Sequence, residues 1–427
     1  MKSFISITLT LFIVSISVKS QDLEQQLFEL PDVIFEKIES ESTSSIVYKL
    51  KVKQPLDHKN PDSGHFYQKV YLTHVGFENL NVIVTEGYSC TRNRIYELTD
   101  LLNANQVEVE HRYFGESMPD SLNYQYLNLE QAAADLHHVN QLMRKIYHGK
   151  WVSTGISKGG ATTIFYRYFF PDDVDVAVPY VAPINYEFEE KRIYEFLDKV
   201  GTEDCREDIK AFQVRMLENR EEIIPWMSFY SLGAKLVFNY LSLEEAFELA
   251  VLEYPFSFWQ WGHQCHEIPS DTVSLQTAVE YLIDVSGIDF FSDISMHSYA
   301  SHYYQSATEM GYYGYETEDF KGLLKALPTD SNPHAAFVPN KMDVEFDGSL
   351  LKKVNSWLKK NGNEFIYIYG ELDTWSASAV PPSKDVDALW FFMNGNHHGN
   401  ARIRNMTEDD KSLLISNLVR WLELEVE

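Results

Sequence analysis

Short apolar segments alternate with amphipathic ones in the first part of the chain. Ile46–Val52 and Phe66–Val75, joined by a turn-rich segment, predict an antiparallel pair of strands. The short segments Asn81–Thr85 and Gln106–Glu110 predict two further strands, with a helix between them at Ile95–Leu102. Strand, helix, strand is the order typical of a parallel sheet.

The clearest helical pattern follows. Its apolar residues recur at spacings of three and four: Leu129, Ala132, Leu136, Val139, Met143 and Ile146. Gly149 is placed to end this helix, and its apolar face is expected to pack on the sheet. A further strand is predicted at Val174–Val181.

The pattern then changes between about residue 185 and about residue 345. Long, charged, helix-favouring stretches such as Leu243–Glu253 replace the strand rhythm. Sheet-type segments return at Phe365–Tyr369 and Ala388–Met393, and a last helix is predicted from about Glu408. We therefore expect a core of strands and helices that is interrupted by a helical insertion.

The predicted domain boundaries follow from these changes. Residues 21–185 and 346–427 are expected to form the sheet domain, and residues 186–345 a largely helical cap. The chain has 427 residues, of which 44% are hydrophobic, so it can bury a large core and exceeds the usual size of one compact domain.

Residues 1–20 have the pattern of a cleaved secretory signal. Lys2 precedes the apolar run Phe4–Val18, and cleavage is expected near Ser20. No later segment is apolar for long enough to span a bilayer. The sequence therefore predicts a secreted or periplasmic protein without stable membrane insertion after signal cleavage.

The net charge limits the possible binding partners, and the number of cysteines limits the possible disulfides. A formal net charge of −27 argues against nucleic acid as a partner, because a phosphate backbone would be repelled over most of the surface. The three cysteines, Cys90, Cys205 and Cys265, permit at most one intramolecular disulfide.

The chemistry centres on Trp151–Ala161, which has the sequence WVSTGISKGGA. An apolar segment leads directly into Gly155-Ile156-Ser157-Lys158-Gly159 and then into a predicted helix. A nucleophile elbow needs this strand, turn and helix, with small residues on either side of the serine because larger ones would collide with neighbouring backbone. Ser157 is therefore the candidate nucleophile, although a bare G-x-S-x-G also occurs by chance in glycine-rich turns.

An acid and a histidine complete the pattern. A serine hydroxyl needs a histidine to accept its proton and an acid to orient that histidine. Asp373 and His397 each follow a late strand, in the chain order Ser, acid, His that α/β-hydrolases use. The predicted fold is therefore an α/β-hydrolase with a large, mainly helical cap inserted in the sheet domain.

Several segments also resemble a known family. They are EHRYFGES at Glu110–Ser117, YLNLEQAAAD at Tyr126–Asp135, the elbow, and API at Ala182–Ile184. Together they resemble the prolyl carboxypeptidase and dipeptidyl-peptidase II family of serine exopeptidases. Lys158 departs from that family, in which tyrosine usually follows the nucleophile. Ser-Lys-Gly-Gly, with TEGY at Thr85–Tyr88, is instead similar to the sister family of secreted bacterial tripeptidyl aminopeptidases.

The resemblance implies a serine peptidase that acts near a chain end and releases short fragments, such as tripeptides, from peptide N-termini through an acyl-enzyme on Ser157. The backbone N–H of Lys158, with that of Gly87 or Tyr88, would bind the oxyanion. The family pattern favours His397 as the base, and the neighbouring His398 stays an alternative.

Further expectations concern the cap and the substrate. Both Cys205 and Cys265 lie in the predicted cap, so we expect them to form the disulfide and Cys90 to stay free. An aminopeptidase needs an anion for the substrate's ammonium group, and Glu267 is the candidate, with Glu86 in reserve. No metal and no cofactor are expected, and peptides are the expected substrates. Glu110 and Arg112 are expected to form a structural polar pair.

Rival functions stay open at this point. An esterase or lipase on the same fold would use the same triad, and a carboxypeptidase would differ only in the direction of substrate binding. The sequence does not reveal the residue preferred before the cleaved bond, the fragment length or the oligomeric state.

Overall fold

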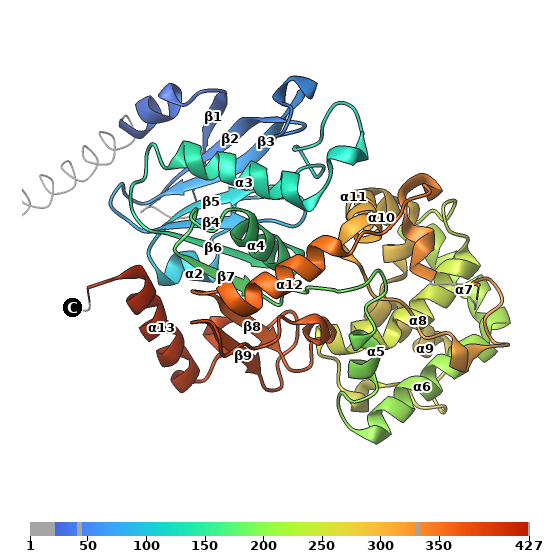
Figure 1. Cartoon of the computed structure of the whole chain (residues 1–427). Helices are drawn as coiled ribbons and strands as arrows, with labels where there is room; N and C mark the ends of the chain where they lie inside the picture. Colours follow the sequence, from blue (N-terminus) through green and yellow to red (C-terminus); the bar gives the residue numbers. More distant parts are fainter. Residues whose placement is uncertain (1–21, 41–44, 329–332, 426–427) are drawn as a thin grey trace, which may run out of the picture. The chain divides into compact units, whose positions relative to one another are not determined.

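The computed structural model describes residues 22–40, 45–328 and 333–425 (Figure 1). The predicted signal peptide, residues 1–20, lies outside them. The chain divides into two compact units: the first runs to Val178 and takes in the end of the chain from Asn417, and the second is Pro179–Ser416. Over the described residues, every helix is too short or too polar to cross a lipid bilayer.

The first unit is built on a mixed sheet with the strand order β1-β2-β3-β5-β4-β6. The strands are β1 (Val33–Ile38), β2 (Ile46–Pro55), β3 (His65–His74), β4 (Asn81–Thr85), β5 (Asn105–Val109) and β6 (Trp151–Ile156). Antiparallel pairs join β1, β2, β3 and β5, whereas β4 pairs in parallel with both β5 and β6. Every residue of β4 and β5 is buried, as expected for strands that are covered on both faces.

Helices cover this sheet and connect its parallel strands. They are α2 (Glu97–Leu101), α3 (Leu129–Met143) and α4 (Lys158–Phe169). The side chain of Asn128 begins α3 by accepting the N–H of Gln131 at 2.9 Å. The apolar face of α3, including Leu136 and Val139, lies in one buried cluster with Ile83 of β4. The predicted packing of this helix on the sheet is therefore confirmed.

Strand β7 (Val176–Tyr180) carries the chain from the first unit into the second. In the second unit Tyr180 pairs with Ile368 of β8 (Ile366–Gly370), and β8 pairs in parallel with β9 (Leu389–Met393). Helix α12 (Ser349–Asn361) precedes β8, and α13 (Glu408–Leu422) follows β9.

The insertion between β7 and β8 is helical. Its α-helices before α12 are α5 (Arg192–Leu197), α6 (Glu203–Glu218), α7 (Arg220–Ala234), α8 (Leu243–Trp261), α9 (Leu275–Ser286), α10 (Asp293–Ser298) and α11 (Ala300–Gln305). In the described part of residues 186–345 no strand forms, and sheet-type pairing is limited to an isolated bridge between Glu189 and Tyr312. This arrangement confirms the predicted α/β-hydrolase fold with a mainly helical cap.

Helix α8 is the central helix of the insertion. Ser242 and Glu245 form a reciprocal capping box at its start, and Gly262, with φ +76°, ends it. From Ala246 to Trp259 nearly every residue is buried, so the helix is enclosed on all sides by the rest of the insertion.

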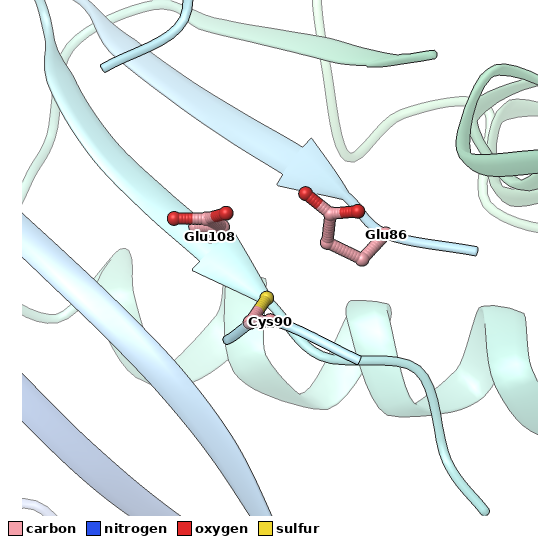
Figure 2. A group of neighbouring side chains, drawn as sticks. All are labelled: Glu86, Cys90 and Glu108. Carbon is pink, nitrogen blue, oxygen red and sulfur yellow. The ribbon is translucent and has the colours of Figure 1, made fainter. Parts of the chain in front are cut away.

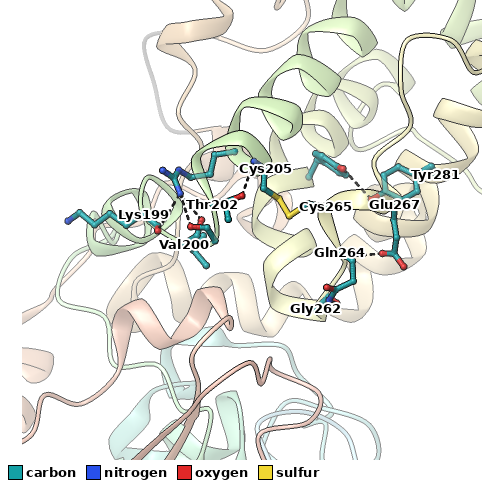
Figure 3. The surroundings of a disulfide bond; sticks show 12 residues. Lys199, Val200, Thr202, Cys205, Gly262, Gln264, Cys265, Glu267 and Tyr281 are labelled. Atoms are coloured by element: carbon teal, nitrogen blue, oxygen red, sulfur yellow. Dashed lines mark hydrogen bonds between the residues drawn. A yellow bond between two sulfur atoms is a disulfide. The ribbon is translucent and has the colours of Figure 1, made fainter.

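A disulfide ties the first turn of α6 to the segment after α8 (Figure 3). It joins Cys205 to Cys265, 60 residues apart, and Cys90 is free and buried. The hydroxyl of Thr202 caps α6 by accepting the N–H of Cys205 at 3.3 Å. The Cys205 end of the bridge is thus held by a local hydrogen bond.

Glu110 and Arg112 do not form the expected pair. Arg112 donates through Nε and Nη2 to the two carboxylate oxygens of Asp135 at 2.6 and 2.7 Å, and both side chains are fully buried. Burial alone would raise the pKa of Asp135, but the adjacent guanidinium holds it below its usual value. Glu110 instead pairs with Lys69 at 2.9 Å. Each side chain is instead satisfied by a different buried partner, Arg112 by Asp135 and Glu110 by Lys69.

Candidate active site

Ser157 lies in the turn between β6 and α4. Its backbone has φ +59° and ψ −125°, a conformation that a residue with a side chain rarely adopts. Its carbonyl accepts the N–H of Ala161 at 2.9 Å, so α4 begins directly behind it. A serine held in this way is the strained elbow that the sequence predicts.

The two flanking glycines are required by backbone contacts. A Cβ on Gly155 would lie 2.3 Å from the carbonyl oxygen of Gly159, and a Cβ on Gly159 would lie 2.5 Å from that of Thr85. Both distances are far below van der Waals contact, and the obstacles are backbone atoms that cannot move aside. The elbow therefore packs against the end of β4, where the proposed oxyanion loop begins.

That loop, Glu86–Cys90, is fixed at three points. The ammonium group of Lys158 donates to the carbonyl of Gly87 at 2.7 Å. The N–H of His111 donates to the carbonyl of Tyr88 at 3.2 Å, and the carboxylate of Glu110 accepts the N–H of Cys90 at 2.8 Å. The EHRYFGES segment thus supports the loop, a role that its residue types alone did not reveal.

Glu110 holds its own segment as well. Its second carboxylate oxygen accepts the backbone N–H groups of Glu116 and Ser117 and the hydroxyl of Ser117, at 2.8 to 2.9 Å. Gly115 adopts φ +51°, and a Cβ there would lie 2.3 Å from the same carboxylate. The buried charge of Glu110 is therefore satisfied by one cation and by several N–H and O–H donors.

In the second unit, Asp373 follows β8 and pairs with a histidine. The pair is formed by His398: its Nδ1 lies 2.8 Å from Oδ2 of Asp373. Both side chains are buried, and Oδ1 of Asp373 accepts the N–H of Trp375 at 3.1 Å. With Nδ1 bonded to the carboxylate, Nε2 of His398 is the nitrogen left to accept a proton.

His397, which the sequence favoured as the base, has different contacts. Its N–H donates to the side chain of Asn400 at 2.7 Å, and its Nδ1 accepts the N–H of Gly399 at 3.3 Å. Its ring packs so closely on Gly262 that a Cβ there would lie 2.4 Å from ring carbon Cδ2. Burial lowers the pKa of His397. The N–H of His398 bonds to the carbonyl of Gln260 at 3.1 Å, which fixes the loop so that His398 faces Asp373.

Comparison with known proteins identifies the family. The family model described as PS-10 peptidase S37 matches residues 16–425. The chain belongs to the S37 peptidase family.

Relatives of this S37 peptidase include exopeptidases that act at either end of a peptide. A prolyl tri/tetrapeptidyl aminopeptidase of Streptomyces mobaraensis is 28% identical over 416 residues, which cover 95% of this chain and 86% of the relative. The human lysosomal Pro-X carboxypeptidase is 22% identical over 380 residues, covering 76% and 75%. Among solved structures, a proline iminopeptidase of Mycobacterium smegmatis superposes with a TM-score of 0.41 at 11% identity, covering 87% of this chain and 98% of that one. The chain is thus a serine-type exopeptidase, and the predicted family is confirmed.

The two candidate anchors of the substrate ammonium have partners within the S37 peptidase. Glu267 accepts the N–H of Gln264 at 2.8 Å (Figure 3). It also lies 3.7 Å from Nδ1 of His263. Glu86 accepts hydrogen bonds from Arg94 at 3.2 Å and from the hydroxyl of Tyr96. An incoming ammonium group would therefore share either carboxylate with groups that already bind it.

Glu86 also belongs to a cluster with Cys90 and Glu108 (Figure 2). One ligand-type atom of each lies within 4.8 Å of the others, so a divalent cation could bind them. A bound proton would also explain how these acidic groups can lie close together. Burial, and then the adjacent Glu86, raise the pKa of Glu108 to about 8. The carboxyl group of Glu108 is therefore protonated near neutral pH and can donate to another oxygen.

Proposed function

We propose that this S37 peptidase is a secreted enzyme that releases short fragments, such as tripeptides, from peptide N-termini through an acyl-enzyme on Ser157. The strained backbone of Ser157 between Gly155 and Gly159 is the observation that carries the proposal, because strained residues of this kind cluster at active sites, where the strain is part of the mechanism. The S. mobaraensis relative, named as a tri/tetrapeptidyl aminopeptidase and matched over 95% of this chain, supports attack at the N-terminal end.

The mechanism assigns one role to each group. Ser157 Oγ attacks the peptide carbonyl while Nε2 of His398 takes its proton, and Asp373 holds the imidazole in the required tautomer. The N–H of Lys158 and that of Gly87 or Tyr88 stabilise the oxyanion that forms. His398 then returns the proton to the leaving amine, which departs as the shortened peptide. Water, deprotonated by the same histidine, releases the N-terminal fragment from Ser157.

Substitutions in the triad test this assignment. Ser157→Ala is expected to abolish fluorophosphonate labelling and to bring peptide hydrolysis near background, and Asp373→Asn to lower kcat by about 10⁴-fold. His398→Ala should be far more damaging than His397→Ala, because only His398 bonds to Asp373 in the structure. Labelling that persists in Ser157→Ala, or equal losses in the two histidine variants, contradicts the proposed roles.

The end attacked needs a separate experiment. The enzyme is incubated with a mixed peptide library, and the released fragments are identified by mass. N-terminal fragments of two to four residues are expected. Release of single C-terminal residues would favour the activity named for the human Pro-X carboxypeptidase, and hydrolysis of acyl esters without peptides would favour an esterase.

N-terminal sequencing of protein exported by a host cell tests cleavage near Ser20.

A further inference from the structure

Lys158 directly follows the nucleophile, yet its side chain lies inside the protein. Only 3% of its surface is exposed, and its ammonium group donates to the carbonyl of Gly87 at 2.7 Å. The ammonium also lies over two aromatic rings, 5.1 Å from the centre of Tyr88 and 4.6 Å from that of Phe114. Such positions favour a cation.

The bond to Gly87 has a consequence for the neighbouring peptide group. A peptide unit is planar, and in its trans form the C=O of one residue and the N–H of the next point in opposite directions. The carbonyl of Gly87 and the N–H of Tyr88 belong to one such unit. A group that holds the carbonyl in place therefore also fixes the direction in which the N–H of Tyr88 points.

We propose that Lys158 is a positioning residue, whose ammonium group aims the N–H of Tyr88 at the oxyanion. The inference rests on the proposed acyl-transfer function and deepens it. The backbone N–H of Lys158 acts directly on the oxyanion, and its side chain orients the second donor. One residue thereby couples the two halves of the oxyanion hole to the elbow that carries Ser157.

The packing of the loop agrees with this role. A Cβ on Gly87 would lie 2.6 Å from Cβ of Lys158 and 2.7 Å from the backbone nitrogen of Gly159. The loop therefore rests directly on the first turn of α4. The ring of Phe114 packs edge-on against that of Tyr88, with centroids 5.6 Å apart, and closes the cage around the ammonium. Rotation of the Gly87–Tyr88 peptide would break the Lys158 bond in this enclosed place, where water cannot easily replace it.

Lys158→Met is the test, because methionine fills the space but cannot donate. Loss of one oxyanion donor in serine peptidases costs about 10²- to 10³-fold in kcat, so a misdirected donor is expected to cost roughly 10- to 100-fold, with KM nearly unchanged. A peptide aldehyde, which forms a tetrahedral adduct with the serine, should lose affinity by a similar factor. Substrate affinity measured in Ser157→Ala and in the double variant with Lys158→Met should agree.

Lys158→Arg and Lys150→Met serve as comparison variants. Arginine keeps a cationic donor and should recover part of the lost kcat and aldehyde affinity. Lys150 directly precedes β6, at the opposite end of that strand from the elbow, and pairs with Asp175 and Glu423 at the surface; Lys150→Met should retain full activity. Circular dichroism and thermal melting show whether each variant is folded.

Two results would overturn the inference. Both are read on Lys158→Met or, if that variant does not fold, on Lys158→Leu, which also cannot donate. A loss of kcat with unchanged aldehyde affinity would show a general packing effect, and wild-type values of both would show no role. These outcomes differ from failure of the proposed function itself, in which Ser157→Ala keeps its activity.

Discussion

Glu253 gives a prediction about stability that needs no knowledge of the substrate. It lies in α8 and is fully buried. The hydroxyl groups of Ser257, Tyr313 and Tyr315 donate to its carboxylate at 2.7, 2.8 and 2.7 Å. Burial raises the pKa of Glu253 to about 7, although the three hydrogen bonds act in the opposite direction.

The sign of the effect follows from the two pKa values. The ordinary pKa of the carboxyl group is 4.5, so between this value and about 7 the unfolded chain has lost a proton that the folded protein keeps. Stability is therefore highest below pH 4.5 as far as Glu253 is concerned, and it falls as pH rises to about 7. A difference of about 2.5 pKa units at 1.36 kcal/mol each corresponds to about 3 kcal/mol.

Glu253→Gln removes this dependence, because an amide of nearly the same shape does not ionise. Urea unfolding, followed by tryptophan fluorescence, is measured for both proteins at about pH 5 and about pH 8. The wild type should lose more stability than Glu253→Gln between these conditions, by about 2 to 3 kcal/mol. Glu244→Gln, an exposed substitution in the same helix, should show the wild-type difference. Equal changes in the wild type and Glu253→Gln would refute the reasoning.

Two further predictions concern the cap. Replacing Cys205 and Cys265 by serine should lower the free energy of unfolding by up to about 4 kcal/mol, the chain-entropy value for a loop of this size, and non-reducing peptide mapping should find Cys90 unbridged. If Glu267 binds the substrate ammonium, Glu267→Gln should lose activity mainly on peptides with free rather than acetylated N-termini. Glu86→Gln is compared in the same way, and an unchanged ratio removes the residue concerned from the site.

The parts of the site that were predictable are those fixed by local sequence. Gly155 and Gly159 are required by backbone contacts within or beside one turn, so their spacing around Ser157 is visible without a structure. The parallel strands were predictable because both faces are buried, which leaves continuous apolar runs such as that of β4.

Other elements depended on tertiary packing. Strand β1 was not predicted, because its residues are half-buried or exposed and its sequence has no continuous apolar run. It pairs with β2 along its whole length, and that pairing defines it. Helix α12 was not predicted: it buries only Leu351, Val354 and Leu358, a narrow stripe within a charged segment.

Which of the two adjacent histidines pairs with Asp373 also could not be read from the sequence and needed the three-dimensional structure. His397 and His398 have the same chemistry and the same position relative to β9, so spacing cannot separate them. The distinction comes from the backbone bond between His398 and Gln260, which lies at the end of α8 and more than 100 residues earlier in the chain. Such contacts leave no local signal in the sequence.

The same reasoning explains why the oxyanion loop needs so much support. The proposed donors are backbone N–H groups, so the side chains of the loop are not expected to bind the oxyanion directly. The residues that hold the loop come from elsewhere in the chain: Glu110 and His111 from the segment after β5, and Lys158 from the elbow. A hydrogen-bond donor stabilises a transition state only if its direction is set before the charge develops, because reorientation during the reaction would cost the energy that the donor supplies. The EHRYFGES and SKGG segments are therefore best understood together, as the two sides of one clamp on the Gly87–Tyr88 peptide.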